Sequence, residues 1–245
     1  MRNIKLTIQY DGSKYRGWQK LGDSDNTIQQ KIENVLNILT EETIDLIGSG
    51  RTDAGVHALN QIANFKTNSK VSTNKILTYC NEFLPKDIVV KDVTEASENF
   101  HSRFNVKEKI YTYKICNNQI QDVFTRKYCY HIPSKLNIQN MKLASMLLIG
   151  EHDFTAFTAL KSKKKSKVRI ISSIDIKENN GNISIVFKGN GFLYKMVRII
   201  VGTLIEVGSG NISVNSVTDI LKSLDRTKAG STAPANGLFL TKVIY

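Results

Sequence analysis

The chain reads GSGRTDAGVHA at residues 48–58, where three glycines surround an arginine and an aspartate. Glycines on both sides of Arg51 and Asp53 let the backbone turn tightly or approach a ligand closely. Apolar segments at 44–47 and 62–65 predict that the stretch is a loop between two strands. A carboxylate beside guanidinium groups stays ionised and can act as a nucleophile, a base or an electrostatic clamp. The alternative is a surface turn with a solvated ion pair.

Known phosphate-binding motifs do not account for this loop. Residues 50–55 have the glycine spacing of a Walker A box, but Val56 and His57 stand where that motif requires a lysine and a hydroxyl residue. A dinucleotide fingerprint that starts at Gly48 fails because Asp53 replaces its third glycine. The acidic side chain is therefore the better candidate for chemistry.

Size and charge limit the classes of protein that fit. The chain has 245 residues, 41% of them hydrophobic, which allows one large domain or two smaller ones. Lysine and arginine number 34 against 22 acids, for a formal charge of +12. This surplus favours a polyanionic partner such as RNA, DNA or an anionic membrane, with solubility alone as the alternative.

Cysteine and histidine usage predicts a cytoplasmic protein without a metal. The three cysteines are widely spaced and odd in number, which excludes a full disulfide framework and a CxxC metal knuckle. Four histidines without an HExxH motif argue against zinc. No apolar run is long enough to span a bilayer, and no secretory signal precedes the first strand, so we expect a reducing compartment.

Hydrophobic periodicity predicts a mixture of strands and helices in each half of the chain. Thr27 is expected to cap the first helix. The expected helices cover residues 28–39, 73–83, 138–148, 192–207 and 214–224. The expected strands cover residues 4–10, 44–47, 62–65, 88–93, 110–115, 168–176, 183–187 and 238–244. This pattern predicts an α+β fold of two related subdomains that share a sheet, at 1–105, which holds the loop 48–58, and 106–245.

Lysines gather at residues 161–167, which read KSKKKSK and continue to Arg169. Closely spaced like charges repel, so we expect a mobile loop. Such a loop can grip phosphates with little sequence preference, and a solvated loop without a partner is the alternative.

The segment GRTDAGVHA at 50–58 resembles the active-site loop of the tRNA pseudouridine synthase A family. Further blocks that resemble this family occur in family order and cover nearly the whole chain. They are YDGS at 10–13, GWQ at 17–19, FHSRF at 100–104, KIYTY at 109–113, GEHDFTAF at 150–157, FLYKMVRIIVGT at 192–203 and APANGL at 233–238. The lysine-rich loop is longer and more basic than the family pattern.

The resemblance implies an isomerase that converts uridine to pseudouridine at positions 38, 39 and 40 of the tRNA anticodon arm. It implies a homodimer in which one tRNA contacts both subunits, with no metal and no organic cofactor, and with neither DNA nor a membrane as a partner. The implied pseudouridine synthase fold has two α/β-plait-like subdomains that share a central, mainly antiparallel sheet flanked by helices.

Three catalytic residues follow from the same resemblance. Asp53 matches the nucleophile, Arg198 the basic residue opposite it, and Tyr111 the active-site tyrosine. A guanidinium orients a carboxylate bidentately, and an arginine among apolar neighbours needs such a partner. Tyr111 can stack on the target uracil and hydrogen-bond near it. The alternatives are a turn-forming aspartate, a surface arginine and a tyrosine that packs in the sheet, as we expect for Tyr113.

Further residues are expected to contact the substrate. Arg51 is placed to fill the space that a flipped base leaves, since extrusion costs a few kcal/mol of stacking and pairing. A phosphate contact is its alternative role. Leu238 is a candidate floor under the uracil, with core packing as the alternative, and Lys14 and Arg16 are candidates for backbone contacts. His57 is expected to be a structural loop histidine.

Two other classes of protein compete with the isomerase. One is an RNA-binding protein that keeps the fold and charge without catalysis, and the joint presence of Asp53, Tyr111 and Arg198 argues against it. The other is a nucleotide-binding enzyme that uses the glycine loop, which the absent Walker lysine weakens.

Overall fold

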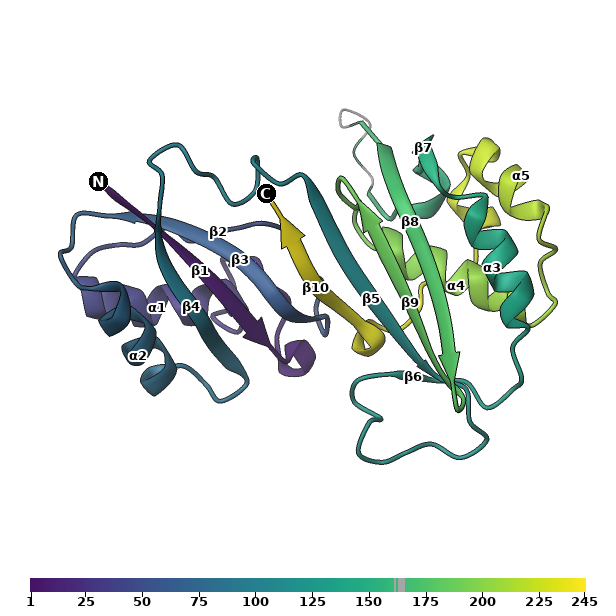
Figure 1. The fold of residues 1–245 in the computed structure, drawn as a ribbon, viewed down its shortest axis with the longest axis horizontal. Helices are drawn as coiled ribbons and strands as arrows, with labels where there is room; N and C mark the ends of the chain where they lie inside the picture. The colour runs from purple at the N-terminus through teal and green to yellow at the C-terminus, as the bar shows by residue number, and fades with distance from the viewer. Residues whose placement is uncertain (161, 163–165) are drawn as a thin grey trace. The chain divides into compact units, whose positions relative to one another are not determined.

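The structure, a computed structural model, describes residues 1–160, 162 and 166–245. The chain forms two compact units (Figure 1). The first comprises residues 1–107 and 239–245, and the second comprises residues 108–238. The sequence predicts one subdomain over 106–245, whereas in the structure the last seven residues belong to the first unit.

The first unit contains a mainly antiparallel sheet in the order β4-β1-β3-β10, with the short β2 paired to the far part of β3. Only β10 runs parallel to its neighbour β3. The strands are β1 (Arg2–Tyr10), β2 (Ile47–Gly48), β3 (His57–Thr67), β4 (Ile88–Ala96) and β10 (Leu238–Ile244). The helices are α1 (Ile28–Thr40), α2 (Thr73–Phe83) and the short 3-10 helix η1 (Gly12–Lys14).

Alternation along β1 decides which face of this sheet is buried. Ile4, Leu6 and Ile8 are fully buried and lie opposite residues 61–65 of β3. Figure 1 shows α1 and α2 together on one side of the sheet. Each of these aliphatic side chains contributes about 1.5–3 kcal/mol on burial. Thr27 caps α1 as predicted, because its side chain accepts a hydrogen bond from the Gln30 N–H at 3.3 Å.

The second unit contains an antiparallel sheet in the order β5-β9-β8-β7, with β6 parallel to β5. The strands are β5 (Glu108–Cys116), β6 (Tyr130–His131), β7 (Gly150–Asp153), β8 (Val168–Asn179) and β9 (Asn182–Gly189). The helices are α3 (Ile138–Met146), α4 (Met196–Gly208) and α5 (Ser216–Ser223), with 3-10 turns at 155–157, 226–228 and 235–237. As its apolar sequence predicts, α4 is buried along most of its length.

The α+β class and the mainly antiparallel pairing are confirmed, and α2 and β10 have the predicted bounds. The helix predicted over 192–207 begins only at Met196, because Lys195 adopts φ +60° and the Met196 N–H bonds the Leu193 carbonyl at 3.0 Å. The strand predicted over 62–65 is longer and begins at His57, where β10 pairs with it. The sequence patterns did not predict β6 and β7. In the described part of the chain, no helix is both long and apolar enough to cross a membrane.

Gly202 tests the close approach of α4 to the segment that follows α5. A Cβ at this position would lie 1.8 Å from the Ser231 carbonyl oxygen. Alanine favours a helix over glycine by about 1 kcal/mol, but the displacement of the backbone costs about 1–3 kcal/mol. We therefore expect Gly202→Ala to lower the free energy of unfolding in urea. Gly22→Ala is the control, since nothing lies within 4 Å of its added carbon; a stabilised Gly202→Ala would contradict the packing.

Candidate active site

Buried hydrogen bonds fix the start of the loop at 48–58. The Ser49 hydroxyl donates to Gln61 Oε1 at 2.6 Å, and Gln61 Nε2 donates to the Gly50 carbonyl at 2.8 Å. The Ser49 N–H donates to the Ile62 carbonyl at 2.7 Å. Neither Ser49 nor Gln61 is exposed to solvent. The Gln61 side chain of β3 therefore holds two successive loop residues, Ser49 and Gly50.

Thr52 anchors the middle of the loop from two sides. Its carbonyl accepts a hydrogen bond from the Trp18 N–H at 3.1 Å, and its hydroxyl lies 2.8 Å from the Tyr10 hydroxyl. Gly17 allows this approach because it has φ +100° and because a Cβ there would lie 2.7 Å from the Thr52 carbonyl oxygen. The loop backbone is thus attached to β1 and to the segment after η1.

Asp53 stands next to this anchor. The Val56 N–H donates to the Asp53 carbonyl at 3.1 Å, which closes a turn directly after the aspartate. Thr52 is buried, whereas Asp53 is partly exposed and Arg51 is exposed. The arrangement fixes the backbone on both sides of Asp53, and a rigid support of this kind is what a reacting group requires.

His57 acts as a structural residue at the end of the loop. Its side chain is buried, its ring stacks on Phe239 with centroids 4.7 Å apart, and Nδ1 accepts from the Gly12 N–H at 3.1 Å. Nδ1 also lies 3.1 Å from Asp11 Oδ1, which favours an ion pair only if the ring is protonated. Because Nδ1 cannot accept from Gly12 while it carries a proton, the Gly12 hydrogen bond describes the neutral ring.

Lys14 and Arg16 are surface cations of the first unit. Lys14 Nζ lies 3.7 Å from Asp87 Oδ2, and Arg16 donates to Asp23 Oδ2 at 3.2 Å. Exposed pairs of this kind contribute about 0–1 kcal/mol. Both cations can therefore exchange their carboxylate for a phosphate at little cost.

Arg198 lies in the first turn of α4 and is tied to the segment before β10. Its Nε donates to the Ala233 carbonyl at 2.8 Å, and the Ala233 N–H donates to the Arg198 carbonyl at 3.0 Å. The Tyr113 hydroxyl donates to the next carbonyl, that of Pro234, at 2.8 Å. Burial raises the pKa of Tyr113, and the nearby charge of Arg198 partly opposes this shift. Tyr113 is completely buried, in agreement with the packing role expected for it.

Tyr111 and Leu238 are both nearly buried. Tyr111 lies on β5 opposite Phe187 of β9, and its ring meets Phe192 edge to face at 5.3 Å between centroids. Its relative exposure is 8%, and that of Leu238 is 5%. The aromatic contact fixes the plane of the Tyr111 ring.

The structure places the predicted residues in two groups. Asp53, Arg51, Lys14 and Arg16 belong to the first unit. Arg198, Tyr111 and Leu238 belong to the second unit. The pairing of the Asp53 carboxylate with the Arg198 guanidinium stays a prediction.

The lysine-rich loop lies largely outside the described residues, which omit Lys161 and Lys163–Lys165. Arg169, which ends that run, is described. Its guanidinium donates to the carbonyls of Ser166 and Val168 at 3.2 and 2.6 Å. Burial lowers the pKa of Arg169.

The sequence analysis missed the residues that support the loop, namely Tyr10, Trp18 and Gln61. Gln61 carried no local signal, because only the pairing of β3 with β1 sets it opposite the buried Ile8. A buried amide needs partners, and the loop backbone supplies them.

The thiols of this chain are poor candidates for a nucleophile. All three cysteines are buried. Burial raises the pKa of Cys80 to about 12 and also raises that of Cys129. The reactive thiolate is therefore scarce at neutral pH. Within the described residues, no group of three or more His, Cys, Asp or Glu side chains is arranged to hold a metal.

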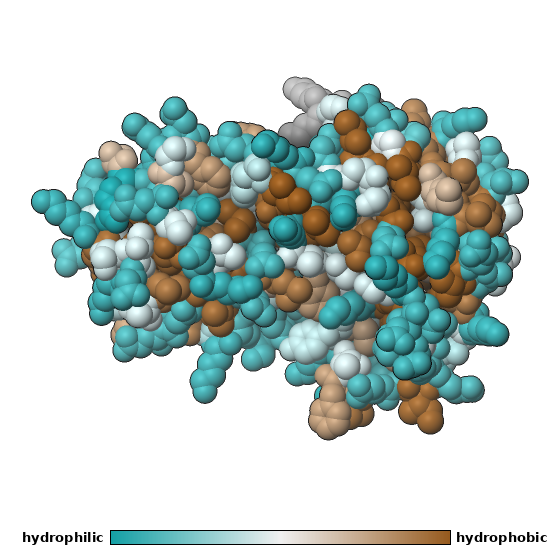
Figure 2. Space-filling model, in the orientation of Figure 1, coloured by the Kyte–Doolittle hydropathy of each residue, from teal (hydrophilic) through white to brown (hydrophobic). Residues whose placement is uncertain are grey.

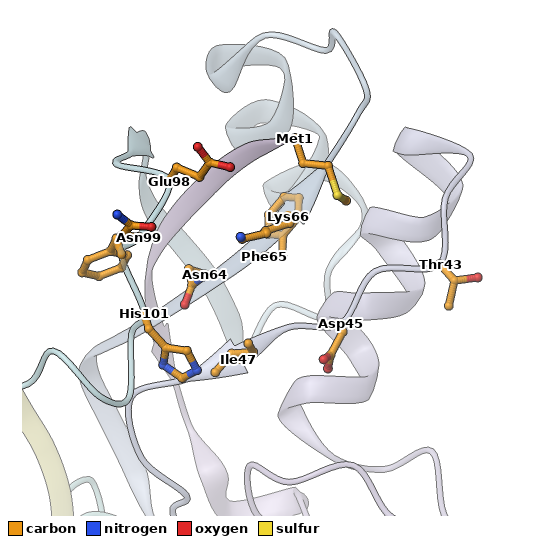
Figure 3. Close-up of a pocket in the computed structure, with 11 residues that line it drawn as sticks. Met1, Thr43, Asp45, Ile47, Asn64, Phe65, Lys66, Glu98, Asn99 and His101 are labelled. Carbon is orange, nitrogen blue, oxygen red and sulfur yellow. The ribbon is translucent and has the colours of Figure 1, made fainter.

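A cavity of about 420 Å³ lies in the first unit, at the end of β3 that is far from His57 (Figure 3). Phe65 in its lining lies eight positions along β3 from His57, or roughly 25 Å along a strand. Figure 3 shows Met1 and Glu98 around one end and His101 and Asp45 around the other. The cavity contains none of the predicted site residues, and its mixed charges select no single class of ligand.

A family model described as tRNA pseudouridine synthase matches residues 6–105 and 144–245. The chain belongs to this family. It is 53% identical to tRNA pseudouridine synthase A of Bacillus sp. (strain KSM-64) and 49% identical to tRNA pseudouridine synthase A 2 of Bacillus cereus. It is 48% identical to tRNA pseudouridine synthase A of Thermoanaerobacter sp. (strain X514). Each comparison covers 100% of both chains.

Membership confirms the family resemblance drawn from the sequence and the isomerase class that it implies. Among solved structures, the chain is similar to one titled as a Cbf5-Nop10-Gar1 complex, at 12% identity and a TM-score of 0.36. The likeness covers 96% of this chain and 57% of that one, and it is too weak to support an argument about function.

The amide of Gln61 tests the support of the loop. Gln61→Leu leaves the Ser49 hydroxyl and the Gly50 carbonyl without their buried partner, so the loop backbone shifts. We expect kcat for pseudouridine formation to fall about 10- to 100-fold, with a much smaller change in KM. Gln30→Leu, which removes an exposed contact to Asn34, is the control and keeps its activity. Full kcat in Gln61→Leu would contradict the role of this clamp.

Proposed function

We propose that this chain isomerises uridine to pseudouridine at positions 38, 39 and 40 of the tRNA anticodon stem-loop, with Asp53 as the nucleophile and with the target base flipped. The observation that carries the proposal is the partly exposed Asp53 beside a backbone that Gln61, Trp18 and Tyr10 hold in place. Membership of the tRNA pseudouridine synthase family supplies the reaction class.

The reaction breaks the N1–C1′ bond and forms a C5–C1′ bond. The proton on C5 is lost and N1 gains a proton, so the nucleoside neither gains nor loses atoms or electrons. The Asp53 carboxylate has two routes, which are attack on the base and attack at C1′ of the ribose with uracil as the leaving group. In both routes the same carboxylate holds the nucleoside while the uracil turns, and the rigid loop limits its movement.

Arg198 and Tyr111 complete the proposed site. In this proposal the Arg198 guanidinium orients the Asp53 carboxylate with the N–H donors of its terminal nitrogens. Its Nε is already fixed by the hydrogen bond to the Ala233 carbonyl. In the same proposal Tyr111, whose ring packs against Phe192, stacks on the target uracil, and Leu238 provides an apolar contact beneath the uracil. Arg51 is exposed and can fill the gap that the flipped base leaves in the stem.

The remaining parts of the proposal concern the partner and the cell. We assign Lys14 and Arg16 to the tRNA backbone. Both side chains are exposed, and the whole chain has a formal charge of +12. We place the enzyme in the cytoplasm as a homodimer in which one tRNA contacts both subunits. The reaction as written requires neither a metal nor an organic cofactor, because no electrons or groups leave the nucleoside.

Asp53→Asn tests the nucleophile. The amide is nearly isosteric but lacks nucleophilic character, so we expect pseudouridine formation in an unmodified tRNA transcript to disappear while the affinity for tRNA stays within about threefold. Mapping of pseudouridine at each position measures the product. Asp92→Asn, on the exposed surface of β4, is the matched control and stays active. Persistent pseudouridine formation by Asp53→Asn would overturn the assignment.

Arg198→Lys tests the bidentate pairing. Lysine keeps the positive charge but lacks the planar fork of donors, so we expect kcat to fall about 10- to 100-fold at unchanged tRNA affinity. Arg226→Lys is the control, because Arg226 also bonds the segment at 229–232 but lies outside the proposed site. Equal kcat in Arg198→Lys and the natural protein would exclude a guanidinium-specific role.

A further inference from the structure

The connection between β5 and β6 exposes several large apolar side chains. All residues from 118 to 128 are exposed. In the described part of the chain, Phe124 and Ile120 are the two most exposed large hydrophobic residues, at 88% and 84%. This connection is the long loop beside β6 at the lower edge of Figure 1, and Figure 2 shows hydrophobic side chains at that edge.

The loop is nevertheless ordered by its own hydrogen bonds. Asp122 Oδ1 accepts from the Phe124 N–H at 2.9 Å, and the Thr125 carbonyl accepts from the Tyr128 N–H at 2.8 Å. The Cys129 thiol donates to the Thr125 carbonyl at 3.3 Å. A preformed loop loses less conformational entropy on binding, so these bonds suit a recognition element.

The base of the loop is attached to the segment that holds Arg198. Asn236 Nδ2 donates to the carbonyls of Cys129 and Arg126 at 2.8 and 3.3 Å. The neighbouring carbonyls of this segment, at Ala233 and Pro234, accept from Arg198 and Tyr113. The Arg198 side chain and the base of the loop are therefore fixed to the same segment.

The charge of the region favours RNA over an apolar protein as the occupant. Residues 114–135 include four cations and one acid, for a net charge of +3, of which +1 lies in the loop at 118–128. Arg126 and Lys127 stand between the exposed rings of Phe124 and Tyr128. Aromatic rings beside cations are the combination that binds single-stranded nucleic acid, with stacking for the bases and positive charge for the phosphates.

We propose that the loop at 118–128 is a second contact surface for the substrate RNA, on which Phe124 stacks against an unpaired base of the anticodon loop while Arg126 and Lys127 contact phosphates. This inference rests on the proposed function and adds a subsite outside the catalytic residues. Each stacked base strengthens binding by about 5- to 150-fold, and the contact is tolerant of sequence because every base has a π-face.

The test measures the affinity of Phe124 variants for an unmodified RNA hairpin that carries the anticodon stem-loop. All variants carry Asp53→Asn, so that no turnover occurs during the measurement. We expect Phe124→Leu and Phe124→Ala to raise Kd by roughly tenfold, whereas Phe124→Trp stays within about twofold because an indole also stacks. Leucine keeps the hydrophobic volume, so it separates stacking from apolar docking.

A second experiment removes the RNA bases that Phe124 is proposed to contact, instead of the Phe124 ring. In a hairpin with abasic residues in its loop, we expect Phe124→Leu and the parent to bind with equal affinity. The double variant Arg126→Ala/Lys127→Ala is expected to lower the salt dependence of log Kd by more than Lys142→Ala, an exposed cation on α3. Equal affinity of Phe124→Leu and the parent for the intact hairpin would overturn the proposal.

A second copy of the chain is the competing occupant. Sedimentation of the variants at the concentrations of the binding assay distinguishes the two occupants. If the loop binds RNA, the oligomeric state is the same in all variants. If Phe124→Ala dissociates while Phe124→Leu keeps its oligomeric state, the loop docks a second copy and the RNA subsite is overturned. A failure of the proposed function is detected by a different measurement. If the natural protein formed no pseudouridine in the mapping assay, the proposed function would be wrong whatever the Phe124 variants bind. The subsite predicts an increase in KM, at constant kcat, when Phe124→Leu is made with Asp53 intact.

Discussion

The amide of Gln61 holds the loop on which the proposed chemistry depends. It accepts from Ser49 and donates to Gly50 inside the first unit, where no solvent competes for these bonds. A buried amide without partners costs about 1–3 kcal/mol, so the core of the unit and the geometry of the loop stabilise each other. The loop glycines would otherwise give the backbone many conformations, and Asp53 would sample positions far from any bound ribose.

In the second unit, hydrogen bonds to the segment at 233–236 play a role comparable to that of Gln61. Successive carbonyls at 233–234 accept from Arg198 and Tyr113, and Asn236 bonds the loop before β6. The chain reaches this segment immediately before β10, which belongs to the first unit. One short segment thus orients the proposed catalytic arginine and fixes the exposed loop that we assign to RNA.

Much of the secondary structure was predictable because local physics decides it. The alternation in β1 and the apolar spacing with the Thr27 cap in α1 require no tertiary information. The start of α4 was mispredicted because the left-handed Lys195 interrupts an apolar run that favours helix throughout. β7 was missed because GEHD has no apolar alternation, and it becomes a strand only by pairing with β8 at the edge of the sheet.

The sequence by itself determined the family and the class of fold, and it pointed to the side chains that we propose as chemically active. It did so because blocks such as GRTDAGVHA combine residue types that few other functions require. Only the tertiary structure decided that Gln61, Tyr10 and Trp18 support the loop, that β10 joins the first unit, and that Phe124 stands exposed. These facts depend on contacts between residues distant in sequence, and local periodicity carries no information about such contacts.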